Sequence, residues 1–263
     1  SQASTRHGWF VRLSSRTTWL VIPCFNEVAR LAGQNIAELV ANDNVGVVLV
    51  DDGSDDGTRE LMFNIQNAGA GVDVLVLQQN MGKAEAVRRG MNHALTLGAK
   101  VVGYLDADFA TPAKDMLALL NKLEANDVKV CLGSRWLHLG AKIDRTAFRH
   151  YGGRVFATIA SSVLKLNIYD TQCGAKAFCV SEVLVRSISE PFLSRWAFDV
   201  ELIGRLLNDA SEDARYTEQD FIEVPLQTWR DIRGSKIRIA DMVTATFELL
   251  LISRALKRWA KRT

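Results

Sequence analysis

Short runs of apolar residues alternate with amphipathic segments along the first half of the chain. The runs lie at residues 19–23, 45–50, 72–77 and 101–105, and valine and leucine fill most of them with little polar alternation. Continuous runs of this kind are typical of parallel strands that are covered on both faces. Helical patterns follow them at residues 27–42, 58–67 and 84–97 and after Pro112, with Thr111 as the expected N-cap. The first half therefore predicts a doubly wound α/β unit.

The second half continues with predicted strands at residues 128–132 and 221–226, and with a turn that enters a short strand at residues 170–178. Helices are predicted at about residues 153–166 and 195–207. No linker rich in Pro, Gly or Ser marks a boundary, so residues 18–236 are predicted to form one domain. We expect residues 1–17 to form a flexible basic segment before the domain, and residues 237–263 to form a basic amphipathic helix.

Composition narrows the class of protein. The 263-residue chain is 48% hydrophobic, which is ample for a core, and its formal net charge of +2 gives no reason to expect a nucleic acid partner. The four cysteines form no C-x-x-C pair and have no histidine at zinc spacing, so we expect reduced thiols in a cytoplasmic protein. No apolar run approaches the roughly 18 to 20 residues that span a bilayer, and the opening residues lack the apolar stretch of a secretory signal.

Two aspartates, Asp106 and Asp108, follow the apolar run at residues 101–105, where the chain leaves the predicted strand. Ligands bind at the carboxyl ends of the strands in an open α/β sheet. Carboxylates two residues apart can turn hard oxygen ligands toward one divalent cation, and such a cation commonly also binds substrate phosphates. Alternatively, the pair only caps a turn or the following helix. The first strand-to-helix loop lacks G-x-G-x-x-G, which disfavours a dinucleotide fold of the dehydrogenase type.

Acidic residues gather in the loops of the first half, and basic residues gather in the loops of the second. The acidic residues are Glu27, Asp51, Asp52, Asp106 and Asp108, and the basic ones are Arg135, Arg145, Arg149, Arg230, Arg233 and Lys236. Carboxylates can hold a metal and the polar groups of a nucleoside, while guanidinium groups bind phosphates in bidentate fashion. This division predicts a site for two phosphorylated substrates; the alternative is a pair of ordinary solvated faces.

The motifs that carry these residues resemble the family 2 glycosyltransferases of the GT-A fold. In chain order they read VIPCFNE, VLVDDGSDDGT, NMGKAEAVRRG, YLDADFATP, GSR, DTQCGAKAF, RWAFDVEL and EVPLQTWRDIRGSK, from about residue 19 to residue 236. More narrowly, the chain is similar to the polyprenyl-phosphate hexose synthases, and DTQCGAK and RWAFDVEL resemble the dolichyl-phosphate glucosyltransferase branch. The resemblance implies a Rossmann-like, mostly parallel mixed sheet flanked by helices over residues 18–236, with the C-terminal amphipathic helix beyond it.

The resemblance also assigns expected roles to individual residues. It implies that Pro23, Glu27, Asp51 and Asp52 line the nucleotide pocket, with Gly82 and Lys83 close by. Asp106 and Asp108 would hold Mg²⁺ or Mn²⁺ on the donor diphosphate. Arg135, with Arg145 or Arg149, would bind the acceptor phosphate, and Arg230, Ser235 and Lys236 would close over the phosphates as a mobile loop. Mannose synthases of this family carry a glutamine two residues after the second aspartate; here that position is Ala110, which favours the glucosyl branch.

The expected reaction is an inverting transfer of a hexose, glucose being favoured, from a nucleotide sugar to a polyprenyl phosphate. The favoured donor is UDP-glucose, with GDP-mannose as the alternative. A phosphate acceptor is already anionic at neutral pH and needs no general base. A sugar or other hydroxyl acceptor would need one, and Asp199 is then the candidate, although a carboxylate at that place also suits a helix N-terminus. A third possibility is a nucleotide-sugar binding module without turnover.

The C-terminal segment offers an independent indication of a lipid partner. Apolar residues recur at helical spacing at Ala240, Val243, Phe247, Leu250 and Leu251, and the cations Arg254, Lys257, Arg258, Lys261 and Arg262 follow them. A basic amphipathic helix of this kind can lie in the interface of an anionic membrane, which would place the protein at the cytosolic face of a membrane. The alternatives are packing against the domain or against a second subunit in a homodimer.

Overall fold

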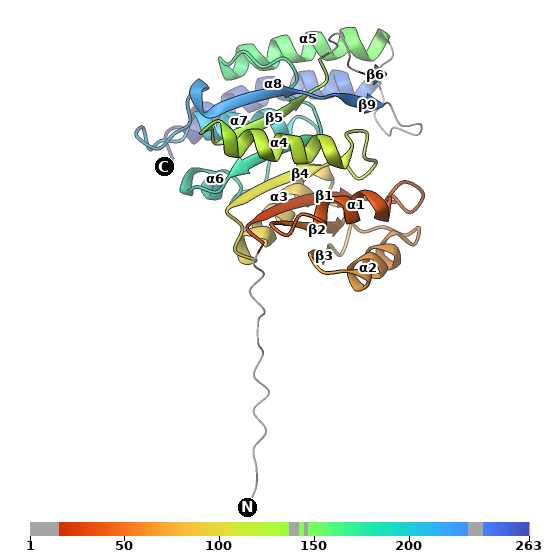
Figure 1. Cartoon of the computed structure of the whole chain (residues 1–263). Coiled ribbons are helices and arrows are strands. Elements are labelled where there is room, and N and C mark those ends of the chain that lie inside the picture. The colour runs from red at the N-terminus through yellow and green to blue at the C-terminus, as the bar shows by residue number, and fades with distance from the viewer. Residues whose placement is uncertain (1–15, 137–141, 145–146, 231–238, 263) are drawn as a thin grey trace, which may run out of the picture.

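The computed structural model describes residues 16–136, 142–144, 147–230 and 239–262. In this part of the chain, seven strands form one sheet in the order β3-β2-β1-β4-β7-β5-β8 (Figure 1). They are β1 (Thr18–Cys24), β2 (Val45–Asp51), β3 (Val72–Val76), β4 (Val101–Leu105), β5 (Val130–Ser134), β7 (Ala175–Cys179) and β8 (Phe221–Pro225). Only β7 runs antiparallel to its neighbours, and the expected mostly parallel mixed sheet is therefore confirmed.

Helices cover both faces of the sheet, as the continuous apolar strands predicted. Their bounds are α1 (Gly33–Val40), α2 (Thr58–Ala68), α3 (Lys83–Thr96), α4 (Ala113–Ala125), α5 (Ala147–Leu164), α6 (Glu182–Ser187), α7 (Phe198–Leu207) and α8 (Ile239–Trp259). Side chains of β1 alternate between two cores: Val21 packs with α3 and α7, whereas Leu20 and Ile22 pack with α1 and α4. This alternation is the period of two that a strand imposes, and here both of its faces are apolar.

The short strand β7 lies inside the sheet, between β4 and β5. It pairs antiparallel with both, and the backbone N–H of Asp106 donates to the carbonyl oxygen of Gly174 just before β7 (3.1 Å). The sequence predicted a short strand here but not its direction. A second sheet pairs β6 (Lys142–Asp144) with β9 (Thr228–Arg230) in parallel. The insertion of β7 brings residues 170–174 beside the end of β4.

Two predicted helix starts are wrong. The first helix begins at Gly33 rather than at residue 27, because the carbonyl of Glu27 accepts N–H groups from Arg30 and Leu31 in a tight turn. At α4 the N-cap is Pro112 in an extended conformation, not Thr111, and its carbonyl accepts the first helical hydrogen bond from Met116 (3.2 Å). The fixed φ of proline suits either position, so its place in the sequence alone did not distinguish them.

Other boundaries differ as well. Helix α5 begins at Ala147, before the predicted residue 153; α7 begins at Phe198 instead of residue 195; and β5 spans Val130–Ser134 rather than residues 128–132. The start of α7 is delayed because the hydroxyl of Ser194 accepts the backbone N–H groups of Trp196 and Ala197 (3.2 and 2.6 Å). Helix α6 and the small β6–β9 sheet were not predicted. Such short elements carry too little periodicity to be recognised in sequence.

The C-terminal helix α8 lies along α5 and packs against α7 (Figure 1). Its buried face carries Leu249, Ile252, Leu256 and Trp259. Of the predicted apolar stripe, Phe247, Leu250 and Leu251 lie on the other face and are more than half exposed, while the side chains of Ala240 and Val243 lie outside the described residues. Among the described residues, no helix is both long and apolar enough to cross a membrane.

Candidate active site

The carboxyl ends of β1, β2 and β4 meet at one edge of the sheet. Strand register pairs Pro23 with Val50 and Cys24 with Asp51, and β4 lies directly on the other side of β1. The loops after these strands carry Glu27, Asp52 and Asp106, so the tertiary structure brings the acidic residues of the first half to the same edge. This is the edge at which open α/β sheets bind ligands.

Asp52 organises the loop that leads into α3. Its carboxylate accepts the backbone N–H groups of Met81 (2.7 Å) and Gly82 (2.8 Å). Burial raises the pKa of Asp52 above its usual value, although these two hydrogen bonds and the nearby Arg195 guanidinium oppose the rise. Gly82 has φ near 91°, and a Cβ there would lie 2.7 Å from Nε of Arg195. The positive φ is what favours glycine here, because the exposed Arg195 side chain can shift.

The neighbouring Asp51 is completely buried at the end of β2. Its carboxylate accepts the N–H of Ser54 (2.9 Å) and pairs with Nε of Arg59 (2.7 Å). Glu27 pairs with Arg30 (2.5 Å), and its own N–H donates to Oγ1 of Thr58 (2.8 Å). Both carboxylates thus shape the loops around the predicted nucleotide pocket, and their direct contact with a nucleotide stays a prediction.

Asp106 lies between a lysine and a glycine backbone. Its Oδ1 atom is 2.5 Å from Nζ of Lys83, the first residue of α3. On its other side the carboxylate rests on the Cα of Gly174, where an added Cβ would overlap the carboxylate oxygens. Burial opposes the charge of Lys83, but the carboxylates of Asp106, Asp199 and Asp108 raise its pKa above the usual value. The glycine of the DTQCGAK motif is therefore a steric requirement of Asp106.

Asp108 shares the negative charge of this corner. Burial raises its pKa, and the neighbouring Asp106 carboxylate raises it further, while Lys83 and Arg30 act in the opposite direction. One of its oxygens accepts the N–H of Ala110 (3.0 Å), which also fits the turn-capping alternative. Two carboxylates this close favour a cation, and their hard oxygens suit Mg²⁺ or Mn²⁺. In the described part of the chain no third His, Cys, Asp or Glu joins them, so donor phosphate oxygens and water would complete such a shell.

Asp199 belongs to a buried charge pair beneath this corner. Its Oδ1 atom accepts from Nζ of Lys176 (2.8 Å) and from the hydroxyl of Tyr104. Lys176 is completely buried, and its ammonium group also donates to the carbonyl of Cys173 (2.5 Å). A carboxylate that balances a buried ammonium is not available to remove a proton without leaving that charge unpaired. The geometry thus favours the structural reading of Asp199 over that of a general base.

Arg135 follows β5 and is fixed by two contacts. Its Nε and Nη2 atoms pair with the two oxygens of Asp170 at 2.6 and 2.7 Å, and its guanidinium lies over the ring of Trp229, 5.4 Å from the centroid. Burial opposes the charge, but Asp170, and more weakly Cys173 and Asp106, hold its pKa above the usual value. The pair with Asp170 uses Nε and Nη2 of Arg135, so Nη1 stays outside it.

Five predicted acceptor or phosphate residues cannot be placed. Arg145, Ser235 and Lys236 lie outside the described residues, as do the side chains of Arg149 and Arg230, whose backbones belong to α5 and β9.

The sequence analysis did not single out five residues that the structure places at or near the site: Asp170, Lys176, Tyr104, Arg195 and Glu223. Asp170 and Lys176 lie in the DTQCGAK motif, and Glu223 is the one charged residue in the otherwise apolar strand FIEVP, which could have drawn attention to it. Tyr104 looked like an ordinary strand residue.

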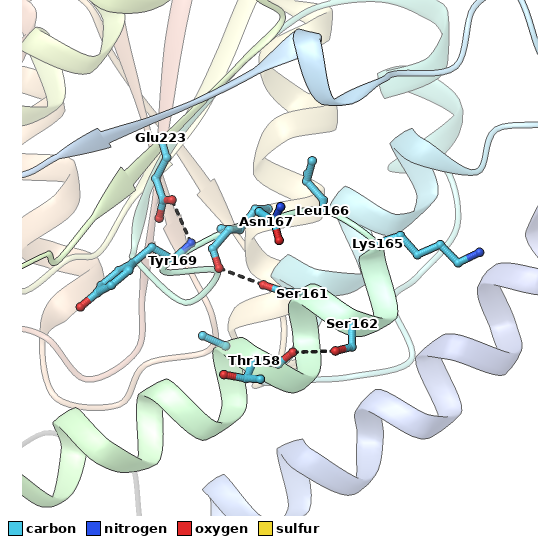
Figure 2. A pocket seen from close by; sticks show the side chains of 10 residues that line it. Thr158, Ser161, Ser162, Lys165, Leu166, Asn167, Tyr169 and Glu223 are labelled. Atoms are coloured by element: carbon cyan, nitrogen blue, oxygen red, sulfur yellow. Dashed lines mark hydrogen bonds between the residues drawn. The ribbon is translucent and has the colours of Figure 1, made fainter.

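An open groove of about 680 Å³ lies between the end of α5 and the loop that leads to β7 (Figure 2). Hydroxyl groups of Thr158, Ser161 and Ser162 line one wall, and Tyr169 and Glu223 line the other. Figure 2 shows the Glu223 carboxylate bonded to the backbone nitrogen of Tyr169. Tyr169, in the wall of the groove, directly precedes Asp170, the partner of Arg135.

Comparison with known proteins identifies the family. The model of Glycosyl transferase family 2 matches residues 19–182. The dolichyl-phosphate beta-glucosyltransferase of Homo sapiens is 32% identical over 240 residues, which cover 83% of this chain and 68% of that protein. The enzymes of the same name from Dictyostelium discoideum and Trichomonas vaginalis are 30% and 29% identical, over 83% and 90% of this chain and 68% and 70% of theirs.

Solved structures agree on the fold. Glucosyl-3-phosphoglycerate synthase from Mycobacterium tuberculosis in complex with Mn²⁺, uridine diphosphate and glucosyl-3-phosphoglycerate superposes with a TM-score of 0.64 at 16% identity, over 97% of this chain and 86% of that one. The same enzyme with Mn²⁺ and UDP-glucose gives 0.64 at 17% identity, over 96% and 84%. With the strand-end carboxylates, the family match and the human relative in agreement, the chain belongs to glycosyl transferase family 2.

Proposed function

We propose that this protein transfers glucose from UDP-glucose to a polyprenyl phosphate at the cytosolic face of a membrane, with the aid of a divalent cation. The relatives from Homo sapiens, Dictyostelium discoideum and Trichomonas vaginalis match most of this chain, and all three are dolichyl-phosphate beta-glucosyltransferases. The observation that carries the proposal is the placement of opposite chemistries at one edge of the sheet: Asp106 and Asp108 follow β4, Arg135 follows β5, and the loop at residues 170–174 lies between them, bonded to both. Such a site holds a metal-bound diphosphate and a second anion together.

The donor side is built from α3 and β4. Asp106 and Asp108 would hold Mg²⁺ or Mn²⁺, which supplies Lewis-acid stabilisation of the departing diphosphate. The Lys83 ammonium group, already at Asp106, is positioned to meet the same phosphates as a point charge. Asp52 fixes the backbone of Met81 and Gly82 directly before Lys83, so the start of α3 is rigid when the donor binds. The N-terminus of α3 adds its favourable dipole for an anion.

The acceptor side needs to orient an anion rather than to deprotonate it. An oxygen of the acceptor phosphate forms the new bond to the anomeric carbon as the bond from that carbon to the UDP oxygen breaks. A phosphate monoester carries this charge already near neutral pH, since its second pKa is about 6. Arg135 would hold a non-reacting oxygen through Nη1. The engagement of Asp199 by Lys176 and Tyr104 supports a reaction that needs no base.

Helix α8 supports the membrane setting. Its exposed face continues from Phe247, Leu250 and Leu251 into the cations Arg254, Lys257 and Arg258 at helical spacing, and the exposed cations Lys261 and Arg262 follow the helix end. The opposite face is already occupied by contacts with the domain. Apolar residues followed by cations suit insertion beside anionic lipid headgroups. A homodimer through this face is the competing arrangement.

The decisive experiment measures nucleoside diphosphate release by the purified protein with Mn²⁺ or Mg²⁺. UDP-glucose and GDP-mannose are each offered with a short polyprenyl phosphate, with 3-phosphoglycerate, with free sugars or with no acceptor. We expect release to require the lipid phosphate, to favour UDP-glucose and to stop with EDTA. Asp108→Asn should abolish it, whereas Asp127→Asn, a matched change at an exposed left-handed turn position, should leave it intact.

Other outcomes separate the alternatives. Release that responds to free sugars and ignores the lipid phosphate would support a hydroxyl acceptor and return attention to Asp199. Tight binding of the donor without release under any condition would support a binding module. Release with 3-phosphoglycerate would retain the phosphate-binding role of Arg135 but overturn the lipid acceptor.

A further inference from the structure

The orientation of Arg135 depends on two chain segments that are themselves held by carboxylates. Asp170 grips the edge of the guanidinium, and Trp229 covers its face. Neither Asp170 nor Trp229 belongs to β5, the strand that Arg135 directly follows. Asp170 lies in the loop before β7, and Trp229 lies in the three-residue strand β9. What fixes these two segments therefore also fixes Arg135.

Glu223 fixes the first segment, the loop that carries Asp170. It lies in the middle of β8, paired in register with Leu132 of the neighbouring β5, and its two carboxylate oxygens accept the N–H groups of Tyr169 (2.9 Å) and Asp170 (2.7 Å). Figure 2 shows the carboxylate pointing from the strand onto the loop backbone. Tyr169 in turn stacks on Trp136, the residue after Arg135, with ring centroids 5.6 Å apart. The glutamate thus ties loop 169–170 to the strand that runs beside Arg135.

Asp115 fixes the second segment, the start of β9, in the same manner. It is a buried residue of α4, and its Oδ2 atom accepts the N–H groups of Gln227 (3.1 Å) and Thr228 (2.9 Å), immediately before Trp229. Two carboxylates on rigid elements therefore each hold a pair of backbone N–H groups, and each held segment contacts Arg135. Hydrogen bonds of this kind are charge-assisted and therefore stronger than those between neutral groups.

We propose that Glu223 and Asp115 are positioning residues for the acceptor phosphate, which act by holding the Asp170 and Trp229 segments that orient the Arg135 guanidinium. The inference rests on the proposed function, in which Arg135 binds that phosphate. Asp170 pairs with Nε and Nη2, so Nη1 is the part of the guanidinium that is left to bind a ligand. Because the carboxylate of Asp170 offsets the charge of Arg135, we expect Arg135 to act mainly through the orientation of its Nη1 hydrogen-bond donors.

Steady-state kinetics of Glu223→Gln test the inference. The glutamine keeps the size of the side chain but replaces one acceptor with a donor that faces a backbone N–H. We expect KM for the polyprenyl phosphate to rise about tenfold, the equivalent of about 1.4 kcal/mol, with kcat and the affinity for UDP changing less than about twofold. Asp220→Asn is the matched control: that carboxylate just before β8 also accepts a backbone N–H, from Thr217 (2.7 Å), but holds no segment that contacts Arg135.

A double-mutant cycle separates positioning from general loss of structure. Once Arg135 is replaced by alanine, Glu223→Gln should have no further effect on KM for the acceptor, because the group that it orients is gone. The same holds for Asp115→Asn. Equal effects of Glu223→Gln in both backgrounds, or a parallel fall in kcat and UDP affinity, would overturn the inference and assign the glutamate to stability alone.

A spectroscopic measurement keeps the inference testable if the proposed acceptor is wrong. In protein labelled with ¹⁵N-arginine, the Nε–H of Arg135 should be protected from exchange by its pair with Asp170, and the signal is assigned by its loss in Arg135→Lys. We expect Glu223→Gln to abolish that protection and Asp220→Asn to retain it. Retained protection in Glu223→Gln would overturn the positioning role of Glu223, whereas absence of lipid-dependent turnover in the wild-type protein would overturn only the proposed function.

Discussion

The Lys83 ammonium group lies 2.5 Å from the Asp106 carboxylate, at the point where the predicted divalent cation would also have to bind. One carboxylate oxygen cannot serve both cations at full strength, so metal binding and the lysine contact compete. A donor diphosphate relieves the competition, because its oxygens offer Lys83 a new partner. Metal binding and nucleotide binding are then coupled through one side chain.

Replacement of Lys83 tests this competition. In Lys83→Met we expect Mn²⁺ to bind several-fold more tightly in the absence of nucleotide and UDP to bind at least tenfold more weakly, a loss of about 1.4 kcal/mol. Electron paramagnetic resonance of free Mn²⁺ measures the first, and calorimetry with UDP the second. Lys114→Met, at an exposed lysine of α4, is the control and should change neither. Weaker Mn²⁺ binding in Lys83→Met would contradict the competition.

The buried pair of Lys176 and Asp199 predicts a large cost for single changes. Removal of either charge leaves the other buried without its partner, which typically destabilises a protein by about 3–5 kcal/mol. We expect Lys176→Met and Asp199→Asn each to lower the free energy of unfolding by that order in urea titrations. The double variant should be less destabilised than the sum of the two. Asp199→Asn with unchanged stability but no turnover would instead identify a general base.

Gly174 should be irreplaceable for a steric reason. A methyl group there would overlap the Asp106 carboxylate, so in Gly174→Ala we expect Asp106 to shift and turnover to fall at least about tenfold, or about 1.4 kcal/mol in the barrier. Gly69→Ala is the control, because nothing lies within 4 Å of a Cβ at that position and its φ of −166° is ordinary extended backbone. Full activity of Gly174→Ala would show that the position of Asp106 is not critical.

Acid pH should weaken acceptor binding through Glu223. Burial raises its pKa above the usual value, and the neighbouring Asp170 carboxylate adds to the rise, while the N–H groups of Tyr169 and Asp170 oppose it. The carboxylate therefore takes up its proton at a higher pH than an ordinary glutamate and then loses one of its two acceptor positions. We expect KM for the acceptor to rise as pH falls through that raised pKa, and more steeply in wild-type protein than in Glu223→Gln.

The same shift has a defined sign for stability. Since the pKa is higher in the folded than in the unfolded state, the folded state favours the protonated form. The contribution of Glu223 to stability is complete below the unfolded pKa and declines as pH rises through the folded pKa. Urea titrations of the wild-type protein and of Glu223→Gln at several pH values should show that the stability advantage of the wild-type protein declines as pH rises. A wild-type protein that gains stability relative to Glu223→Gln over the same rise in pH would contradict the assignment.

The exposed face of α8 predicts membrane binding that can be removed without loss of the fold. Leu250 and Leu251 are 57% and 56% exposed, so we expect Leu250→Asp/Leu251→Asp to reduce sedimentation with anionic vesicles strongly while leaving the melting temperature within a few degrees. Phe63→Asp is the control, at an exposed apolar residue of α2 near the opposite edge of the sheet (Figure 1). Unchanged vesicle binding, together with a loss of dimers in ultracentrifugation, would assign this face to a subunit contact.

The sequence alone determined the mostly parallel sheet, its covering by helices on both faces and the acidic strand ends. Those features follow from local patterns: continuous valine and leucine runs, helical spacing, and aspartates where a strand stops. It also revealed the apolar stripe of the C-terminal helix. Periodicity shows that such a stripe exists but not which face the domain already covers.

Only the tertiary structure decided which partners the charged residues meet. Lys176 and Asp199 are 23 residues apart and Glu223 is 53 from Asp170, and their contacts exist because β7 enters the sheet antiparallel between β4 and β5. That insertion sets Gly174 against Asp106 and brings Asp170 to Arg135. Pairing across a sheet depends on strand order and direction, which local sequence patterns do not encode. The sequence therefore showed which charged residues are present, whereas the fold decided which of them face the site and which hold other residues in place.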